Sequence, residues 1–554
     1  MNWNESSVVL FFYVAILFSY AKCSGEVSVN SKVGIIKGLI AKDGTYFKYT
    51  GIPYARIVPK NPFGLSIPYP FFEDVFLAYN DSQMCPQYNQ ETQKIEGTLD
   101  CLHLNVYLPV SVNTTARNLP VMIWIYGGRF EKGHADEHTF GPSYLVQNGV
   151  ILVTFNYRIG PYGFMCLDVS AVPGNQGLRD QYLAIKWVND NIEAFGGDKN
   201  QITVFGQSAG GHSIDHHLMS PKKVLFNKAI IQSGSAQALT ALYDPDKFAA
   251  VKLARYTGLD TNDTKQALLY LSQVDPKLVI SATMALKIHF RPCVENLFDN
   301  VRPFISKSWI NAKVPKVRSM PVLIGFNELE LAYQIFPKGP DYFNNLTIVL
   351  DYLIKAFHFT DHEFREAEDV INDFYFGDEE MSEDLKVIVT QFSSDITFIH
   401  PVHRTLQKYI DNGAGNIYFY MFSYVGERNA VNNYTFERVD NSRVLCCASH
   451  SDELEYLFHM KNKPELLYPS EIIKDRMVAM WTNFAKYSDP TPTISTLLPV
   501  KWIPMTPETY YYLNIDNELE VRRRPLNMRM AFWDLFFNKY KKFQKGFEDV
   551  CEPV

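Results

Sequence analysis

The stretch ITVFGQSAGGHS, residues 202–213, decides the fold of this 554-residue chain. It begins as a short apolar strand at 202–205 and breaks into G-Q-S-A-G at 206–210, before a proline-free segment that suits a helix. At a sharp strand-to-helix turn the central residue is forced toward positive φ, and the flanking glycines let the two backbones approach closely. The Ser208 hydroxyl would then project from the sheet at the N-terminus of the helix. The partial positive charge of the helix dipole lies close to it there.

Short apolar runs of strand type lie on both sides of this turn. They occupy residues 121–126, 150–156, 202–205, 229–233, 322–326 and 417–422. Between the second and third runs, residues 178–198 have the apolar spacing of a helix and close on a pair of glycines. Buried strands that alternate with helices predict an α/β protein with a mostly parallel sheet and helices on both faces. No repeat or low-complexity linker divides the chain, so we expect a single domain over residues 26–554.

Composition and charge exclude several classes of protein. Hydrophobic residues make up 47% of the chain and charged residues 20%, which is too apolar for a disordered protein. The net charge of −7 arises from mixed signs without a long basic run, so the sequence gives no indication of nucleic-acid or anionic-membrane binding. We expect a small neutral molecule as the partner.

The N-terminus carries an apolar run at residues 8–18, followed by small and polar residues. This run is too short to span a bilayer as a helix, so it predicts a signal peptide over residues 1–25 with cleavage near 21–25. The alternative is a buried N-terminal segment, because no basic residue precedes the run. We expect a soluble secreted chain without a membrane anchor, with glycosylation candidates on surface loops at Asn80, Asn113, Asn262, Asn345 and Asn433.

An ordered series of motifs resembles the type-B carboxylesterase and cholinesterase family of α/β-hydrolases. The series consists of GIPYAR (51–56), DCLHLNVYLP (100–109), WIYGGRF (124–130), NYRIGPYGF (156–164), PGNQGLRDQ (173–181), FGGD (195–198) and GQSAGG (206–211). The resemblance implies the α/β-hydrolase fold and a triad in the chain order serine, acid, histidine, with no cofactor. GQSAG and LRDQ are also similar to the juvenile-hormone-esterase branch of insect enzymes.

The resemblance assigns an acid and a base to Ser208. GFNELEL (325–331) is similar to the segment that carries the family's acid, and its spacing selects Glu330 over Glu328. The family usually places a glycine after the acid, so Leu331 predicts a distorted loop. HSDELEYLF (450–458) matches the family's histidine loop, so His450 is the expected general base.

The same resemblance assigns the N–H groups that stabilise the oxyanion to Gly128, Arg129 and Ala209. Arg129 stands where the family has its third glycine. Its N–H survives, but three outcomes for its side chain remain open: the Cβ displaces the turn, the guanidinium leans over the active-site cavity, or the side chain points to solvent and changes nothing.

Eight cysteines include Cys23, which lies in or beside the signal peptide, and this leaves an odd number in the mature chain. The resemblance implies a disulfide between Cys85 and Cys101, which closes a loop without the tryptophan that binds choline in cholinesterases. The family's second disulfide is not evident, because Cys293 is the only cysteine between Cys166 and Cys446. Cys551 is either the link in a homodimer or a free thiol. The adjacent Cys446 and Cys447 are expected to be structural.

His212, Asp215 and His216 allow a competing hypothesis, because histidines four residues apart on a helix can share a metal. The segment lacks the glutamate of a metalloprotease helix and follows the predicted turn directly. A packing or polar role is therefore the better prediction, with no metal.

Two functions follow from these patterns. The first is a secreted serine carboxylesterase that acts on small to medium apolar esters, and the second is a catalytically silent family member used for adhesion or ligand binding. Silent members usually lose a triad residue, whereas this chain keeps a candidate for each place.

Overall fold

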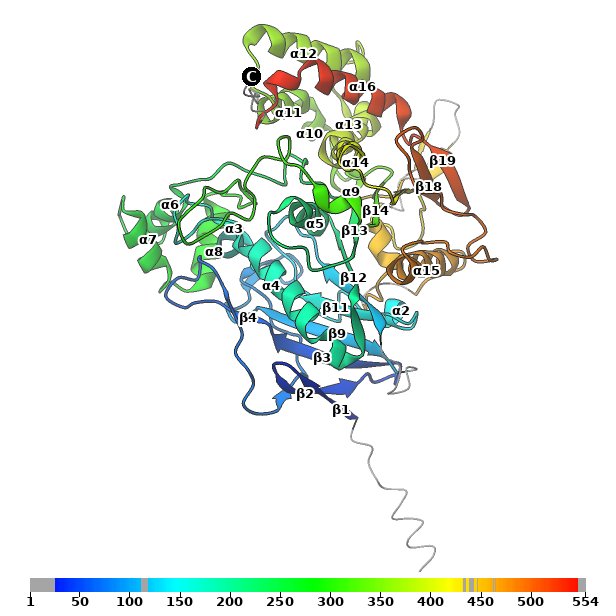
Figure 1. Cartoon of the computed structure of the whole chain (residues 1–554). Helices are drawn as coiled ribbons and strands as arrows, with labels where there is room; N and C mark the ends of the chain where they lie inside the picture. Colours follow the sequence, from blue (N-terminus) through cyan, green and yellow to red (C-terminus); the bar gives the residue numbers. More distant parts are fainter. Residues whose placement is uncertain are drawn as a thin grey trace, which may run out of the picture.

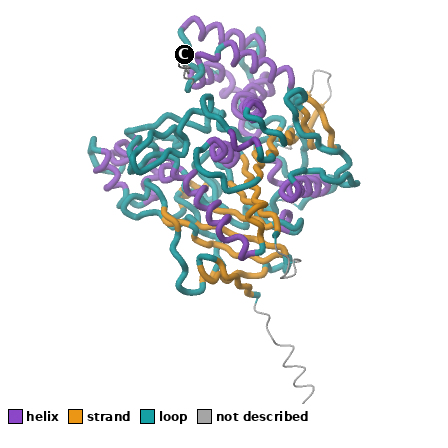
Figure 2. Tube along the Cα trace, in the orientation of Figure 1, coloured by secondary structure: helices purple, strands orange, loops and turns teal. Residues whose placement is uncertain are grey.

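The computed structural model describes residues 25–110, 118–431, 435–437, 443–445, 447–461, 463 and 465–546. The expected signal peptide lies outside these residues, as do Cys23, Asn113, Asn433, Cys446 and Cys551. Figure 1 shows the chain with its elements labelled, and Figure 2 shows a strand layer enclosed by helices.

A large mixed sheet forms the centre of the described chain. Its strand order is β1-β2-β3-β9-β11-β10-β12-β13-β14-β15-β18-β19, and the short β6 pairs with β2. The bounds are β1 Glu26–Ser31, β2 Gly34–Ile40, β3 Tyr46–Pro53, β6 Phe76–Leu77, β9 His103–Pro109, β10 Leu119–Ile125, β11 Ile151–Phe155, β12 Gly197–Gln207, β13 Lys228–Gln232, β14 Val322–Asn327, β15 Ile417–Phe422, β18 Tyr511–Ile515 and β19 Leu519–Arg523.

The six apolar runs of the sequence form the parallel core of this sheet. From β11 through β10, β12, β13 and β14 to β15, every neighbouring pair is parallel. The residues of β11, β13, β14 and β15 are all buried, as expected for strands covered on both faces. The flanking strands β1, β2, β3 and β9 on one side and β19 on the other add antiparallel pairs.

Chain reversal within the parallel core places helices on both faces. The chain passes from β10 to β11 in one direction and from β11 to β12 in the other, so right-handed crossovers put α2 (Ser143–Val146) opposite α4 (Gln176–Asn191) and α5 (Ala209–Met219). Figure 1 shows this arrangement, with α15 (Ser470–Tyr487) on the α2 side. The strand order reverses between β10 and β12, and crevices at such points bind ligands in α/β proteins.

The remaining helices gather at two places (Figure 1). One group packs beside the start of α4 and comprises α3 Gly160–Phe164, α6 Ala249–Tyr256, α7 Thr264–Leu271 and α8 Pro276–Ala285. The other caps the carboxyl ends of the strands and comprises α9 Ala332–Ile335, α10 Pro340–Asn344, α11 Ile348–Ala356, α12 Asp361–Tyr375, α13 Lys386–Ser394, the π-helix Asp395–Ile399, α14 His400–Asp411 and α16 Asn527–Lys539. Minor strands are β4 Ala55–Arg56, β5 Ile67–Pro68, β7 Gln87–Asn89, β8 Lys94–Glu96, β16 Thr435–Glu437 and β17 Arg443–Leu445.

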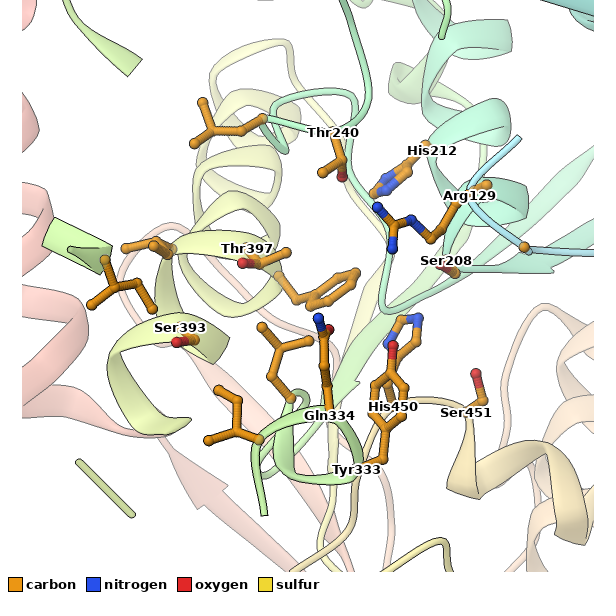
Figure 3. Close-up of a pocket in the computed structure, with 18 of the residues that line it drawn as sticks. Arg129, Ser208, His212, Thr240, Tyr333, Gln334, Ser393, Thr397, His450 and Ser451 are labelled. Atoms are coloured by element: carbon orange, nitrogen blue, oxygen red, sulfur yellow. The ribbon is translucent and has the colours of Figure 1, made fainter. Parts of the chain in front are cut away.

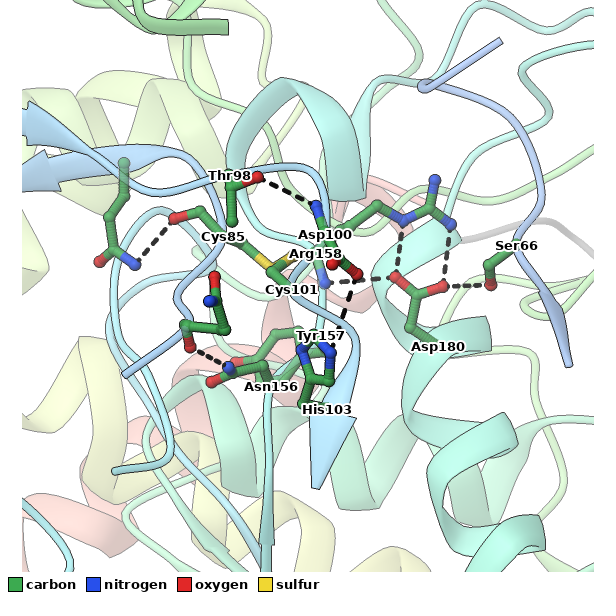
Figure 4. The surroundings of a disulfide bond; sticks show 12 residues. Ser66, Cys85, Thr98, Asp100, Cys101, His103, Asn156, Tyr157, Arg158 and Asp180 are labelled. Carbon is green, nitrogen blue, oxygen red and sulfur yellow. Dashed lines mark hydrogen bonds and ion pairs between the residues drawn. A yellow bond between two sulfur atoms is a disulfide. The ribbon is translucent and has the colours of Figure 1, made fainter. Parts of the chain in front are cut away.

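Cys85 and Cys101 form a disulfide across 16 residues, and β7 and β8 lie in the loop that it closes (Figure 4). Beside it, the side chain of Arg158 donates two hydrogen bonds to Asp180 of α4, at 2.7 and 2.8 Å. Both side chains are fully buried, and Ser66 donates to the same carboxylate at 2.5 Å. The segment that follows β11 is thereby fixed to α4.

A second disulfide joins Cys166 to Cys293 across 127 residues. The expectation that no second disulfide is evident is therefore wrong, because Cys293 needs no second cysteine between Cys166 and Cys446 and pairs with Cys166 itself. Gly174 has a φ of +115° and lies against both sulfurs, so that a Cβ there would come within 2.5 Å of the Cys293 Sγ. Cys447 is disulfide-bonded as well.

Three predicted glycosylation sites fall within the described chain. Asn80, Asn262 and Asn345 are exposed and lie in loops, as expected of acceptor sites. Among the described residues, none of the helices has the length and apolar character that crossing a membrane requires.

Candidate active site

Ser208 lies between the end of β12 and the start of α5, with φ +56° and ψ −124°. This conformation is rare for a residue with a side chain and is the strained turn expected from the sequence. A Cβ on Gly210 would come within 1.9 Å of the Ile125 carbonyl oxygen at the end of β10, and one on Gly206 within 2.7 Å of the same atom. The glycines are therefore needed because the turn packs directly against the neighbouring strand.

The turn after β10 lies beside this serine. A Cβ on Gly127 would lie 3.0 Å from the Ser208 Cβ, which places the two turns in contact. Arg129 has φ +60° and Phe130 has φ +59°, so both occupy the left-handed region. Arg129 is therefore held in a backbone conformation that costs an ordinary residue about 1 kcal/mol, and its replacement of the family's glycine is strained.

His450 and Glu330 come together from two loops that follow strands. Nδ1 of His450 lies 2.6 Å from the Glu330 Oε2, and the backbone N–H of His450 donates to the Glu330 carbonyl oxygen at 2.9 Å. The other carboxylate oxygen, Oε1, accepts from the Ser233 hydroxyl at 2.7 Å and from the Asn327 N–H at 2.8 Å. This carboxylate is fully buried and holds the imidazole with Nδ1 as the protonated nitrogen.

Nε2 of His450 faces Gln207 in this structure. The side-chain nitrogen of Gln207 lies 3.1 Å from that atom, and it must donate because the proton of the neutral ring is on Nδ1. Among the described residues, no hydrogen bond joins Ser208 to His450. Both side chains nevertheless line the same cavity and lie next to each other in Figure 3. Catalytic hydrogen bonds are often long before substrate binds.

Two rings flank the His450 imidazole. The Phe398 ring lies 4.3 Å away and the Tyr333 ring 6.3 Å away, measured between ring centroids. A second carboxyl group, Glu453, is buried near Glu330 and accepts from the Asn327 amide at 2.6 Å. Burial, followed by the negative charge of Glu330, raises the pKa of Glu453.

Leu331 does not distort the loop that carries the acid. Its φ is −98°, which any residue adopts, and its N–H donates to the Ser394 hydroxyl at 3.0 Å. The expectation of a distorted loop is wrong, because this position does not need the positive φ that would require a glycine.

A cavity of about 710 Å³ opens over Ser208. Its walls come from the turn after β10, from α5 and from the helical cap, and most of the surface contributed by the cap is apolar, including Leu331, Ile335, Ile396 and Phe398. Arg129 also lines the cavity, and Figure 3 shows its side chain projecting inward from the oxyanion turn. Arg129 is an exposed residue that also lines the cavity, which corresponds to the second of the three outcomes, a guanidinium over the cavity.

The sequence matches the carboxylesterase family over residues 25–533. The chain belongs to this family. It is 31% identical over 541 residues to juvenile hormone esterase of Tribolium castaneum, with 89% of each chain covered. It is 30% identical over 534 residues to bile salt-activated lipase of Rattus norvegicus, covering 92% of this chain and 84% of that protein.

A solved structure of juvenile hormone esterase from Manduca sexta, with OTFP covalently attached, matches with a TM-score of 0.77 at 24% identity. The match covers 93% of this chain and all of that one. The α/β-hydrolase fold expected from the sequence is thereby confirmed.

The three residues of the metal hypothesis make hydrogen bonds within the protein in this member of the carboxylesterase family. His212 accepts from the Ser235 N–H at 2.8 Å, and His216 lies 3.0 Å from the Ala241 carbonyl oxygen. Asp215 accepts from the Tyr409 hydroxyl at 2.7 Å. These contacts are those of the polar packing role that the sequence favoured.

Sequence reasoning missed Gln207 and His212 as residues of the site. Gln207 was read only as part of the motif, although it precedes the nucleophile directly. For His212 the sequence suggested a metal ligand or a packing role, but no place at the cavity. Its position one helical turn after Ser208 could have placed it at the cavity, because residues four apart share a helix face.

Proposed function

We propose that this carboxylesterase family member is a secreted serine esterase that hydrolyses small to medium carboxylic esters through an acyl-enzyme. The observation that carries the proposal is the buried Glu330–His450 pair, which faces the same cavity as the strained Ser208. No other group is needed for ester hydrolysis by this route.

The reaction begins when the Ser208 Oγ forms a bond to the ester carbonyl carbon while its proton passes to Nε2 of His450. The N–H groups of Gly128, Arg129 and Ala209 stabilise the oxyanion. The ester C–O bond then breaks, and Nε2 returns the proton to the departing alcohol. A water molecule then attacks the acyl-enzyme carbonyl while its proton passes to Nε2 of His450. The bond to Ser208 Oγ breaks, Nε2 returns the proton to Ser208, and the carboxylic acid is released.

For the reaction to start, Nε2 of His450 must exchange its contact with Gln207 for one with Ser208. Ser208 and His450 line the same cavity, so the exchange calls for a rotation of their side chains. Glu330 stays in place throughout, since it is held by two further donors and stabilises the imidazolium.

A fluorophosphonate tests this proposal, because it bonds covalently only to an activated serine. Mass spectrometry should locate one adduct on Ser208 in the wild type, none in Ser208→Ala and none in His450→Ala, with all three proteins folded by circular dichroism. Both variants should also lose hydrolysis of a p-nitrophenyl ester, because the triad acts as a unit.

A catalytically silent binding protein is the second candidate. Two observations favour it: Nε2 of His450 is occupied by Gln207, and an arginine stands in the oxyanion turn. A folded wild-type protein that takes up no fluorophosphonate would support this alternative and overturn the first.

A further inference from the structure

The cavity over Ser208 has an uneven distribution of charge. Of the described residues that line it, Arg129, Lys132 and Lys355 are cations and Asp351 is a carboxylate. Asp351 and Lys355 lie one turn apart on α11 and balance each other. Lys132 donates to the Gln90 side chain. Arg129 has no carboxylate partner within the described part of the chain, so its charge is available to a ligand.

His212 supplies a neutral donor to the same cavity. Its Nδ1 accepts the Ser235 N–H, so the proton of the ring is on Nε2. Burial lowers the pKa of His212 to about 3, and the ring stays neutral in ordinary buffers. The side chain is 3% exposed and lines the cavity, and no described residue accepts from its Nε2. This N–H group therefore belongs to a nearly buried side chain that lines the cavity, and no hydrogen bond from it to a described residue is present.

The two side chains are linked by the oxyanion turn. Phe130, which follows Arg129, places its ring 6.2 Å from the His212 ring. Figure 3 shows Arg129 and His212 projecting into the cavity from the same side of Ser208, with Thr240 beyond them and the His450 ring on the other side.

The chemistry of acyl transfer decides which part of an ester meets these donors. The departing oxygen must lie within reach of His450, which protonates it, and the carbonyl oxygen must lie at the oxyanion donors. The acyl chain takes the remaining direction, away from His450. Figure 3 shows Arg129 and His212 on the side of Ser208 away from the His450 ring, so an acyl chain that extends away from His450 reaches toward these two side chains.

We propose that Arg129 and His212 form a carboxylate-binding subsite on the acyl side, so that the enzyme prefers half-esters of short dicarboxylic acids to esters of neutral acids. A guanidinium presents paired N–H donors that match a carboxylate. The Nε2–H of His212 adds a donor on a ring that stays neutral in ordinary buffers. The proposal rests on the proposed esterase function and assigns its acyl specificity, while the apolar cap is left to receive the alcohol.

Monoethyl glutarate and ethyl 5-methylhexanoate form a matched pair of substrates for the test, because an isopropyl group replaces the carboxylate at equal size. Wild type should show at least a tenfold higher kcat/KM for the charged ester at low salt. Arg129→Met should remove this preference, and Arg129→Lys should retain part of it. Lys355→Met removes one positive charge from the part of the cavity wall formed by α11 and should keep the preference.

Equal kcat/KM for both esters in wild type would overturn the subsite while leaving the esterase intact. An equal loss of preference in Arg129→Met and Lys355→Met would also overturn it, since it would indicate only a general positive field. If neither ester is hydrolysed, the esterase proposal fails, and binding still tests the subsite. Calorimetric titration of folded Ser208→Ala should then show tighter binding of monoethyl glutarate than of the neutral ester, and the difference should vanish when Arg129→Met is added.

Discussion

The side chain of Gln207 donates to Nε2 of His450 across 3.1 Å, the same atom that must take the proton of Ser208. The residue before the nucleophile thus competes with the nucleophile for the base. A hydrogen bond of this kind contributes about 1 kcal/mol, which corresponds to about a fivefold change in an equilibrium.

Gln207→Met should therefore raise the rate at which fluorophosphonate inactivates the enzyme, by about fivefold, because Nε2 becomes free for Ser208. Methionine has a similar length and lacks the amide donor. Stopped-flow inactivation kinetics measure the effect at saturating reagent. A slower reaction would indicate that Gln207 supports the base instead of competing with it.

Glu330→Gln should lower kcat by about 10⁴-fold at neutral pH, because an amide can hold the imidazole in the wrong tautomer and cannot stabilise the imidazolium. Glu328→Gln is the matched control, since it makes the same change two residues earlier in the same loop. Steady-state hydrolysis of a p-nitrophenyl ester compares the two. A larger loss in Glu328→Gln would mean that the acid is assigned to the wrong residue.

Arg129→Gly should raise kcat on small neutral esters and widen the range of acyl chains accepted. Glycine adopts φ +60° without strain, keeps the N–H of the oxyanion hole and removes the guanidinium from the cavity. Steady-state kinetics over an acyl series from acetate to octanoate would reveal both effects. The idea fails if kcat and the chain-length profile stay those of the wild type.

Choline esters should be poor substrates. The loop between Cys85 and Cys101 contains no tryptophan to bind a quaternary ammonium, and its contribution to the cavity wall includes Gln90. Arg129 and Lys132 would also repel the cation. We expect kcat/KM for butyrylcholine to be below that for 3,3-dimethylbutyl butyrate, its uncharged isostere, and a clear preference for the choline ester would contradict this.

Asp395 makes the stability of the helical cap depend on pH. It accepts a hydrogen bond from the Tyr375 hydroxyl at 2.6 Å and forms an ion pair with Arg529 at 2.9 Å, yet burial raises its pKa to about 6. The folded protein thus favours the protonated carboxyl, so the free energy of unfolding falls as pH rises from about 4 to about 6. Raising the pKa from 3.8 to about 6 corresponds to at most about 3 kcal/mol.

Asp395→Asn removes this dependence because asparagine does not titrate. Urea denaturation at pH 4 and pH 7 should show the stability of wild type, relative to the variant, declining over that interval. A difference between the two proteins that is the same at both pH values would mean that Asp395 is already ionised at pH 4.

The six strands of the parallel core were predictable because each is an apolar run without a compensating polar face. The run at 322–326 became β14, Val322–Asn327, and the run at 417–422 became β15 with the same bounds. Strands β1 and β2, whose residues largely alternate between more and less buried positions, were missed because only continuous apolar runs were interpreted as strands. The resemblance to the family, and not the apolar pattern, supplied the candidates for the acid and the base.

Three features of the site depend on tertiary structure and could not be read from the sequence. The pairing of Cys166 with Cys293 requires two loops to meet across 127 residues. The direction of the Arg129 side chain depends on its positive φ. An arginine in the sequence does not predict a positive φ. The contact of Gln207 with His450 joins residues 243 positions apart.

The Cys166–Cys293 disulfide encloses the nucleophile in a covalent ring. Strand β12, Ser208, helix α5 and strand β13 all lie between the two cysteines. A protease that cut the ring once, for example beside Phe248, which is 67% exposed, would leave one covalent molecule. The two fragments on either side of such a cut would stay joined by this disulfide, so a single cleavage would not release the segment that carries Ser208 from the rest of the chain.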